Sequence, residues 1–214
     1  MEEDNITTLF LDIGGVLLTN GWDMQERHLA AIHFDLDEDE MNERHHLISD
    51  IYESGKLTLD EYLDRIVFYR QRDFSKTDFT KFMFDQSQPI KGSIEFFKGL
   101  KEQYQLRVMA VSNEARELNE FRIQKYKLNQ LFDCFVSSCY VHLRKPDVDI
   151  FQMACNIAQT PLSNILFIDD RDICVEAALS LNITSYRFLS LAATEKYMKT
   201  LNFAVDSRIE KVNH

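Results

Sequence analysis

Short apolar runs alternate with amphipathic stretches along most of this chain. The first run, Ile6–Asp12, is rich in β-branched and apolar residues and leads directly into Gly14 and Gly15, so it predicts a buried strand that enters a tight turn. Similar runs occur at Leu106–Val111, Phe132–Val136, Ile165–Ile168 and Ile183–Phe188. Alternation of this kind favours an α/β fold, in which a parallel sheet carries crossover helices on both faces.

Helical periodicity marks the segments between these runs. Apolar residues recur at helical spacing in Gly92–Gln103, Asp147–Ala158 and Ile173–Leu181, which is typical of amphipathic helices. A further helix is predicted over Ala115–Tyr126, with Ser112-Asn113 before it as polar N-cap residues.

The segment from Leu18 to Gln88 interrupts the alternation, because it lacks strand patterns and contains several helical ones. We expect helices over Met24–Phe34, Asp39–Glu53 and Thr58–Gln71, with loop-like edges at Thr19-Asn20-Gly21 and Gln86-Ser87-Gln88-Pro89. The sequence therefore predicts a helical insert over residues 18–88, joined to a sheet domain formed by residues 1–17 and 89–214. Two connecting strands of chain make a natural hinge.

Composition and charge exclude several classes of function. The chain has 214 residues with 24 Lys and Arg against 35 Asp and Glu, a net charge of −11. Such an acidic chain repels nucleic acid and anionic membrane surfaces. Its apolar runs are far shorter than the roughly 20 residues that span a bilayer, and the acidic start Glu2-Glu3-Asp4 is unlike a secretory signal. We therefore expect no nucleic-acid or membrane partner and a cytoplasmic location.

Four cysteines, Cys134, Cys139, Cys155 and Cys174, are spaced without a metal-binding or disulfide pattern, so we expect reduced, buried thiols.

Polar residues follow the predicted strands at the point where each one ends. They are Asp12 after the first strand, Ser112 and Asn113 after the second, and Asp169 and Asp170 after the fourth. Ligands of open parallel sheets bind outside the carboxyl ends of the strands. Lys145 lies in a loop before a predicted helix and completes the candidate set.

Three carboxylates that converge on one lysine and one hydroxyl need a counter-ion, because like charges at close range do not all remain ionised. Mg²⁺ binds oxygen ligands and meets this need. With Mg²⁺ in place, Asp12 can attack phosphorus as a nucleophile. Lys145, Ser112 and the amides that follow would then neutralise the phosphoryl oxygens.

Taken together, four short segments resemble the ordered motifs of the haloacid dehalogenase-like hydrolase superfamily. They are Phe10–Leu17, Val111-Ser112-Asn113, Lys145-Pro146-Asp147 and Phe167–Asp170. The helical insert also resembles the cap that members of the first cap class carry between motifs one and two. The resemblance implies a three-layer Rossmann-like fold with a mobile cap. It further implies a Mg²⁺-dependent phosphohydrolase acting on a small-molecule phosphate ester.

The same resemblance implies roles for individual residues. Asp12 would be the nucleophile, Ser112 would hold the phosphoryl group and Lys145 would stabilise it. Asn113, Gly14 and Gly15 would assist in phosphate binding. Asp12, the backbone carbonyl of Gly14, Asp169 and Asp170 would hold the metal.

One position departs from the pattern of this superfamily. Most of its phosphatases carry a second Asp two residues after the nucleophile as a general acid and base, and this chain has Gly14 there. General acid–base assistance is worth ~10²–10⁴ in rate, so a leaving group that needs little protonation would suffer least. Sugar 1-phosphates have such a leaving group, and the glucose-1-phosphatase-like branch also carries Asp-x-Gly. We therefore expect a sugar phosphate substrate, with sugar 1-phosphates favoured.

Two other functions remain open. A hydrolytic dehalogenase also lacks the second Asp, but those relatives work without metal and do not keep the pair Asp169-Asp170. A catalytically impaired phosphate-binding regulatory protein would be consistent with Gly14. The sequence leaves the oligomeric state open, and a monomer is compatible with it.

Several smaller expectations concern single side chains. The insert holds four histidines, His28, His33, His45 and His46, whose spacing fits no ordinary zinc site; we expect them at the surface or in the core. Trp22, just past the hinge, could face a substrate. Cys174 is expected to pack, and Asn182 suits a left-handed position after a helix.

Overall fold

The computed structural model describes residues 5–203. Its centre is a five-stranded, fully parallel sheet in the order β4-β3-β2-β5-β6. The strands are β2 (Thr8–Leu11), β3 (Arg107–Ser112), β4 (Cys134–Ser137), β5 (Ile165–Asp169) and β6 (Thr184–Arg187). A short parallel pair, β1 (Asn5–Ile6) with β7 (Asn202–Phe203), lies beside it. The predicted α/β class with a parallel sheet is confirmed.

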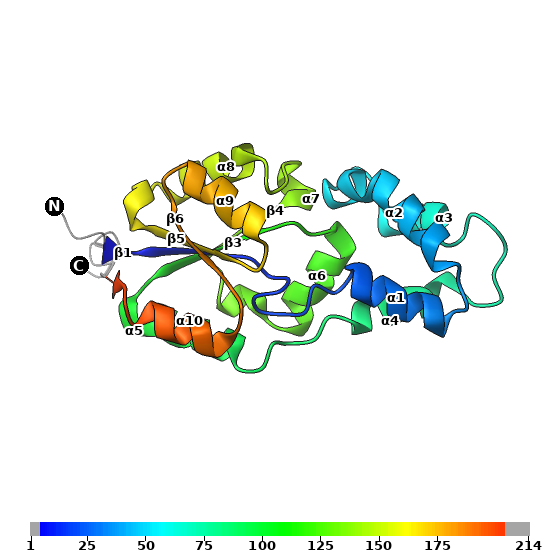
Figure 1. Ribbon diagram of the computed structural model, residues 1–214, viewed down its shortest axis with the longest axis horizontal. Coiled ribbons are helices and arrows are strands. Elements are labelled where there is room, and N and C mark those ends of the chain that lie inside the picture. Colours follow the sequence, from blue (N-terminus) through cyan, green and yellow to red (C-terminus); the bar gives the residue numbers. More distant parts are fainter. Residues whose placement is uncertain (1–4, 204–214) are drawn as a thin grey trace.

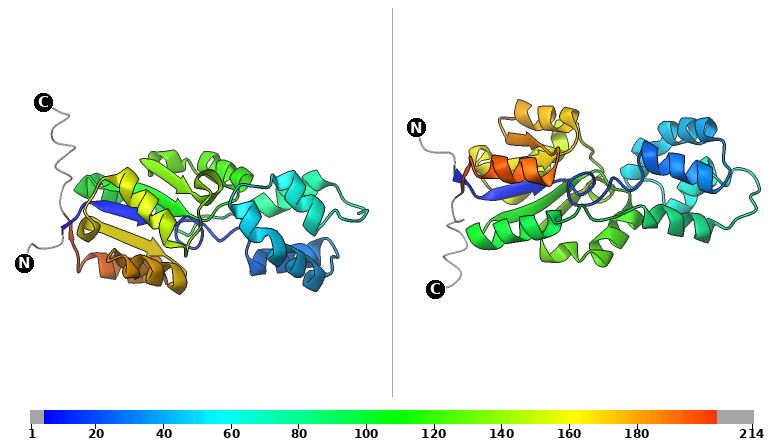
Figure 2. Two further views of the ribbon diagram at one scale, coloured as in Figure 1. Left: turned by 90° about the horizontal axis from the view of Figure 1, so that it is seen from above. Right: turned by 60° about the horizontal axis from the view of Figure 1, so that its bottom comes forward.

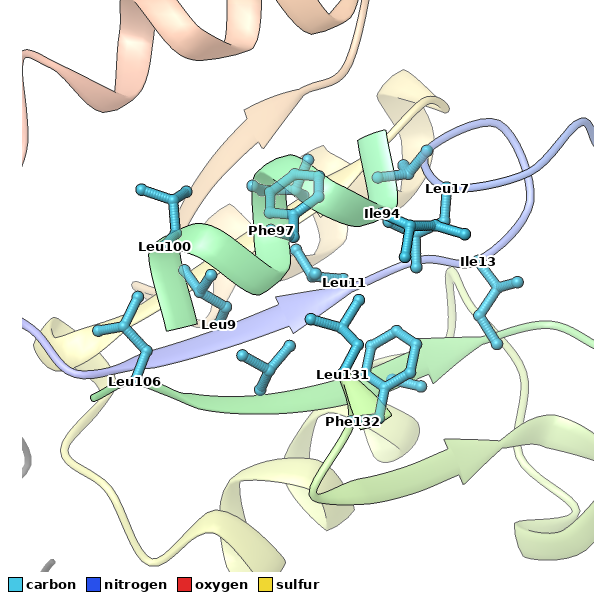
Figure 3. Close-up of a cluster of buried hydrophobic side chains, with 14 of the residues drawn as sticks. Leu9, Leu11, Ile13, Leu17, Ile94, Phe97, Leu100, Leu106, Leu131 and Phe132 are labelled. Atoms are coloured by element: carbon cyan, nitrogen blue, oxygen red, sulfur yellow. The ribbon is translucent and has the colours of Figure 1, made fainter. Parts of the chain in front are cut away.

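Helices cover both faces of this sheet, so the core has three layers (Figure 1). On one face lie α8 (Val148–Ala158) and α9 (Asp172–Ser180), and on the other lie α5 (Ser93–Tyr104) and α10 (Leu191–Met198). Side chains of β2 alternate between the two, as a strand requires. Leu9 and Leu11 pack against Phe97 of α5 (Figure 3), whereas Phe10 joins the cluster of α8 and α9.

The remaining elements of the sheet region are short or lie at its edge. They are α6 (Arg116–Lys125), α7 (Ser138–Val141) and the 3₁₀ turns η1 (Leu128–Gln130) and η2 (Leu162–Asn164). The helix α6 begins after Ala115, which makes no side-chain cap, so the predicted capping by Ser112-Asn113 is wrong. Ser112 instead ends β3.

Four helices between β2 and β3 form a separate group beyond the end of the sheet (Figure 2). They are α1 (Met24–His33), α2 (Glu38–Glu53), α3 (Leu59–Ile66) and α4 (Lys76–Asp85). The helix α3 ends five residues before the predicted Gln71, and Arg72 Nε donates to the carbonyl of Val67 at its end, at 2.8 Å. The helix α4 is not among the helices that the sequence predicts for the insert. The division of the chain at residues 17/18 and 88/89 stays a prediction.

This helical insert has a hydrophobic cluster of its own. Trp22, Tyr62, Phe79 and Met83 are buried in it. Leu118 of α6 also packs into this cluster, so the insert rests on the sheet domain through an apolar contact as well as through its two linkers.

Both linkers of the insert converge on one buried arginine. Arg122 of α6 donates to the carbonyls of Thr19 and Asn20, at 3.2 and 2.6 Å, and to the Ser87 hydroxyl at 3.0 Å. The two linkers also bond to each other, because the amide of Thr19 donates to the carbonyl of Gln88 at 2.8 Å. Arg122 therefore holds the two connections side by side at the edge of the core domain.

Two further expectations are met within residues 5–203. All four cysteines are free thiols, as expected, but only Cys139 and Cys174 are buried, and the expected burial of Cys134 and Cys155 is wrong because both are partly exposed. Asn182 adopts a left-handed backbone with φ 61° directly after α9. None of the described helices combines the length and the apolar character needed to cross a membrane.

Candidate active site

Asp12 lies at the carboxyl end of the central strand β2 and is 8% exposed. Three donors meet on its Oδ1 atom: the Ser112 hydroxyl at 2.6 Å, the Ile13 amide at 2.9 Å and the Lys145 ammonium at 3.0 Å. Ser112 comes from the end of the neighbouring strand β3, one hundred residues away. Parallel pairing of β2 with β3 thus brings the two side chains together, and the three donors hold the carboxylate in one orientation.

Lys145 is buried, with 3% of its surface exposed, so it is not a solvated surface lysine. Its Nζ lies 2.5 Å from Asp169 Oδ2 and 3.0 Å from Asp12 Oδ1. Asn113 positions the loop that carries it: the Asn113 amide accepts from the Lys145 N–H at 2.9 Å and donates to the Lys145 carbonyl at 2.8 Å. Asn113 therefore acts on the site through the backbone of Lys145.

Three carboxylates form an acidic cluster beside this lysine. Asp12, Asp169 and Asp170 each present an oxygen, and these oxygens lie within 4.8 Å of one another. Asp169 Oδ1 accepts from the Arg171 amide at 2.8 Å. Asp170 Oδ2 accepts from Asn20 at 3.3 Å, but its buried Oδ1 has no hydrogen-bond partner within the described chain.

The pair Asp169-Asp170 does not cap the following helix. The N-cap of α9 is Arg171, which makes no side-chain cap.

Gly15 allows the first loop to approach the acidic cluster. Its backbone is left-handed, with φ 70°, and a Cβ atom there would lie 2.2 Å from Asp170 Cγ. Only glycine combines this backbone conformation with so close an approach. Gly14 does not have a left-handed backbone, but a Cβ atom there would lie 3.0 Å from Asn20 Oδ1 and 3.8 Å from a guanidinium nitrogen of Arg122.

The charges at this site do not balance. Burial raises the pKa of Asp12 to about 7, the Lys145 ammonium opposes that shift, and the Asp169 carboxylate adds to it. Burial also raises the pKa of Asp170. Asp12 and Asp169 together raise the pKa of Lys145 against the effect of burial. Lys145 contacts Asp12 and Asp169, and Asp170 lies beside them. A bound cation would stabilise the ionised forms of all three carboxylates.

A cavity of about 200 Å³ opens over these residues. Its floor contains Asp12, Gly14, Lys145 and Asp169, and the insert contributes Trp22 and Tyr52. The expectation that Trp22 faces this space is met. The volume lies below the ~300–1,000 Å³ usual for drug-sized ligands, which favours a small ligand.

Sequence reasoning missed several residues that line this cavity. Glu114, Arg122, Arg144 and Asn20 all contribute to its walls. Glu114 follows Ser112 by two positions and pairs with Arg122 at 2.6 Å, and both side chains are 2% exposed. Glu114 lies just before α6 and Arg122 lies within it, and nothing in the local sequence marks the two as a buried pair, so only the fold reveals it.

The histidines of the insert separate into different environments. His28 pairs with Glu38 at 2.8 Å on the surface, and His33 stacks on Phe82. His45, by contrast, lines the cavity. Its expected place at the surface or in the core therefore needs correction, because α2 turns one face toward the end of the sheet.

Comparisons with solved structures agree with this fold. A haloacid dehalogenase-like family enzyme from Bacteroides thetaiotaomicron superposes with a TM-score of 0.72 at 20% identity, over 86% of this chain and 93% of that one. The same enzyme in complex with magnesium and inorganic phosphate gives a TM-score of 0.70 at 21% identity, over 86% and 94%. A defluorinating L-2-haloacid dehalogenase gives 0.62 at 16% identity, over 87% and 82%. At these identities the likeness concerns the fold alone.

Sequence comparisons give the family. A curated drimenol cyclase of Aspergillus calidoustus is 29% identical over 140 residues, which is 64% of this chain. The match spans only 26% of the length of that cyclase. A model of the haloacid dehalogenase-like hydrolases matches residues 6–181, most of the chain. This protein therefore belongs to the haloacid dehalogenase-like hydrolase family.

Proposed function

We propose that this hydrolase is a Mg²⁺-dependent phosphatase that acts on a small phosphorylated metabolite through an aspartyl-phosphate on Asp12. The observation that carries the proposal is the acidic cluster of Asp12, Asp169 and Asp170 around a single buried lysine. A divalent cation supplies the positive charge that this arrangement lacks and allows it to accept an anionic phosphate ester.

The cluster fits Mg²⁺ on the chemistry of its donors. Carboxylate oxygens are hard ligands, and the buried Asp170 Oδ1 has no hydrogen bond among the described residues, so it retains lone pairs for a cation. Asp12, Asp169, Asp170 and the carbonyl of Gly14 are the proposed ligands. When bound, the cation supplies positive charge beside the phosphoryl oxygens.

The first chemical step uses residues that the fold already orients. A carboxylate oxygen of Asp12 forms a bond to phosphorus while the bond from phosphorus to the leaving oxygen breaks. Lys145 lies 3.0 Å from the Asp12 carboxylate, so its ammonium is placed to neutralise phosphoryl charge as that charge moves toward Asp12. Ser112 and the backbone amide of Gly14 are the remaining proposed contacts of the phosphoryl group, and Asn113 holds the Lys145 loop. The amide of Gly15, a predicted phosphate-binding residue, instead donates to the carbonyl of Leu18 at 2.7 Å. Water then hydrolyses the acyl phosphate, which releases inorganic phosphate and restores Asp12.

The leaving oxygen must gain a proton, and Gly14 offers none. This absence favours leaving groups that depart easily as anions, such as the hemiacetal oxygen of a sugar 1-phosphate. We propose a sugar phosphate as substrate for this reason and because the cavity is small. Residues 18–88 would act as the cap over it, on the core formed by residues 1–17 and 89–214.

The alternative is a metal-independent dehalogenase, since L-2-haloacid dehalogenases are among the structures with this fold. Against it stands the acidic cluster, which without a metal ion would leave three buried or half-buried carboxylates beside a single contacting lysine. The third possibility is a phosphate-binding regulatory protein without turnover.

A single screen separates these functions. The purified chain is assayed on phosphorylated metabolites and on 2-haloacids, each with Mg²⁺ and with EDTA. We expect phosphate release that requires Mg²⁺ and disappears in Asp12→Asn, whose amide is nearly isosteric but a poor nucleophile. Asp60→Asn serves as the control, because Asp60 is an exposed side chain of the insert. Halide release in the presence of EDTA would establish the dehalogenase. Tight, Mg²⁺-dependent phosphate binding without turnover would establish the regulatory protein.

A further inference from the structure

A chain of hydrogen bonds in the insert ends at the cavity. The Trp22 indole donates to the Tyr62 hydroxyl at 2.8 Å, and the Tyr62 hydroxyl contacts His45 Nδ1 at 2.6 Å. Tyr62 is fully buried, with its ring stacked on Tyr52 at 4.0 Å. Tyr62 thus lies in the middle of the chain, with Trp22 on one side and His45 on the other.

The direction of these bonds follows from which atoms carry hydrogen. An indole N–H only donates, so the oxygen of Tyr62 accepts from Trp22. The single proton of the Tyr62 hydroxyl is then free to point to His45, where Nδ1 must accept it. A neutral imidazole with an acceptor at Nδ1 carries its hydrogen on Nε2. The relay thus selects the Nε2–H tautomer of His45.

His45 stays neutral in this environment. Burial lowers its pKa to about 3, and the cations Arg27, His46 and Arg144 act in the same direction against the carboxylate of Asp23. Tyr62, its hydrogen-bond partner, has a pKa raised by burial, so it remains a hydroxyl. A histidine of this kind is no source of protons for a leaving group, and it does not replace the acid missing at Gly14. It is a hydrogen-bond donor.

The donor faces the space in which the leaving group would lie. His45 lines the same cavity as Asp12 and Lys145, but from the insert on the opposite side. Its Nδ1 is occupied by Tyr62. Within the described part of the chain, no group forms a hydrogen bond with Nε2, so Nε2 is the ring nitrogen available to a ligand.

Outside the acidic cluster and Lys145, the charged side chains that line the cavity are paired with one another. Three carboxylates that line it each contact an arginine that also lines it: Glu114 with Arg122 at 2.6 Å, Glu53 with Arg144 at 2.5 Å, and Asp23 with Arg171 at 3.1 Å. This part of the cavity has no surplus positive charge for a second anionic group and no surplus negative charge for an amine. It suits an uncharged group with polar oxygens.

We infer that His45 is a specificity-determining residue whose Nε2–H donates a hydrogen bond to a hydroxyl or ring oxygen of an uncharged, polyhydroxylated leaving group. The inference rests on the proposed phosphatase function and adds to it the side chain that recognises the part of the substrate beyond the phosphate.

Two substitutions separate the two nitrogens of His45. Asn places an acceptor near the position of Nδ1 and has nothing at Nε2, so His45→Asn keeps the contact to Tyr62 and loses the cavity donor. Gln places an amide near Nε2, so His45→Gln keeps a donor in the cavity. The substrates are α-D-glucose 1-phosphate and phenyl phosphate, whose leaving group has no hydroxyl substituent or ring oxygen.

We expect His45→Asn to lower kcat/KM for glucose 1-phosphate about tenfold, the effect of one lost hydrogen bond. The value for phenyl phosphate should stay within about twofold, and His45→Gln should keep most of the preference for the sugar. Equal losses on both substrates would show a merely structural role and overturn the inference, as would unchanged kinetics on both.

A second measurement tests the relay without turnover. Long-range ¹H–¹⁵N NMR spectra distinguish the two imidazole tautomers and the imidazolium. We expect the Nε2–H form for His45 from pH 5 to 8, and loss of this single form in Tyr62→Phe. An Nδ1–H tautomer or an imidazolium in this range would overturn the inference. If the wild type hydrolyses neither substrate with Mg²⁺, the proposed function fails, and the substrate role of His45 fails with it even where the tautomer is as expected.

Discussion

Restoring a carboxyl group at position 14 tests how the missing proton donor limits this enzyme. In the wild type, the rate of the chemical step should depend steeply on the acidity of the leaving group, because the departing oxygen keeps its charge in the transition state. Gly14→Asp should flatten that dependence. The new side chain needs room, since its Cβ would lie 3.0 Å from Asn20 Oδ1. The test therefore compares Gly14→Asp/Asn20→Ala with Asn20→Ala alone.

The size of the gain follows from what surrounds the new group. A well-placed general acid is worth ~10²–10⁴ in rate. Here a guanidinium nitrogen of Arg122 lies 3.8 Å from the position of the new Cβ, and an opposite charge so close lowers the pKa of a carboxyl by about 1–3 units. Each unit removes a factor of ten in the protonated fraction at neutral pH. We expect a gain of about 10- to 100-fold on alkyl phosphates at pH 7, and a larger gain at lower pH.

The assay is a series of phosphate esters from p-nitrophenyl phosphate through sugar 1-phosphates to sugar 6-phosphates, measured as kcat/KM. The double variant should raise the alkyl end of the series and leave the aryl end unchanged. A flat series in the wild type would refute the reasoning, because it would mean that another group already supplies the proton.

Three further predictions concern stability and metal binding. Arg122→Met should lower the free energy of unfolding by about 3–5 kcal/mol in urea titrations, because it leaves Glu114 buried without its partner. Adding Glu114→Gln should recover part of the lost stability. A loss below about 1 kcal/mol in the single variant would contradict the prediction. Burial lowers the pKa of His45 from 6.5 to about 3, so the free energy of unfolding should fall by about 1.4 kcal/mol for each pH unit below 6.5, until the pH reaches about 3. His45→Asn should show a shallower fall of the free energy of unfolding between pH 6.5 and 5. Parallel curves of this free energy against pH for the variant and the wild type would contradict the prediction. Gly15→Ala should weaken Mg²⁺ binding in calorimetry, since its Cβ would meet the acidic cluster at 2.2 Å, whereas Gly99→Ala, with nothing within 4 Å of its Cβ, should bind as the wild type does.

Short-range patterns in the sequence were enough for the architecture of the core. The continuous apolar run Leu9-Phe10-Leu11 indicates a strand buried on both faces, and β2 has helices packed on each side. Asn182 has the left-handed conformation expected from its place after a helix. These features depend on neighbours within a few residues, so local chemistry predicts them.

The candidate site was visible in the sequence as a set of strand ends. Parallel strands end at the same edge of a sheet, so the sequence alone predicts that Asp12, Ser112 and Asp169 meet. The structure places them together. What they do in catalysis stays a proposal, and the screen with Asp12→Asn tests it.

Only the tertiary structure decided which side chains complete the cavity. Glu114 lies just before α6 and Arg122 lies within it, so their spacing does not mark them as a buried pair. The structure buries both, and the two linkers of the insert bond to Arg122. The same holds for His45, whose tautomer depends on Tyr62, seventeen residues away on another helix. Helical periodicity shows which face of a helix is apolar, but the partner of that face depends on how the insert packs on the sheet, and this is a property of the whole chain.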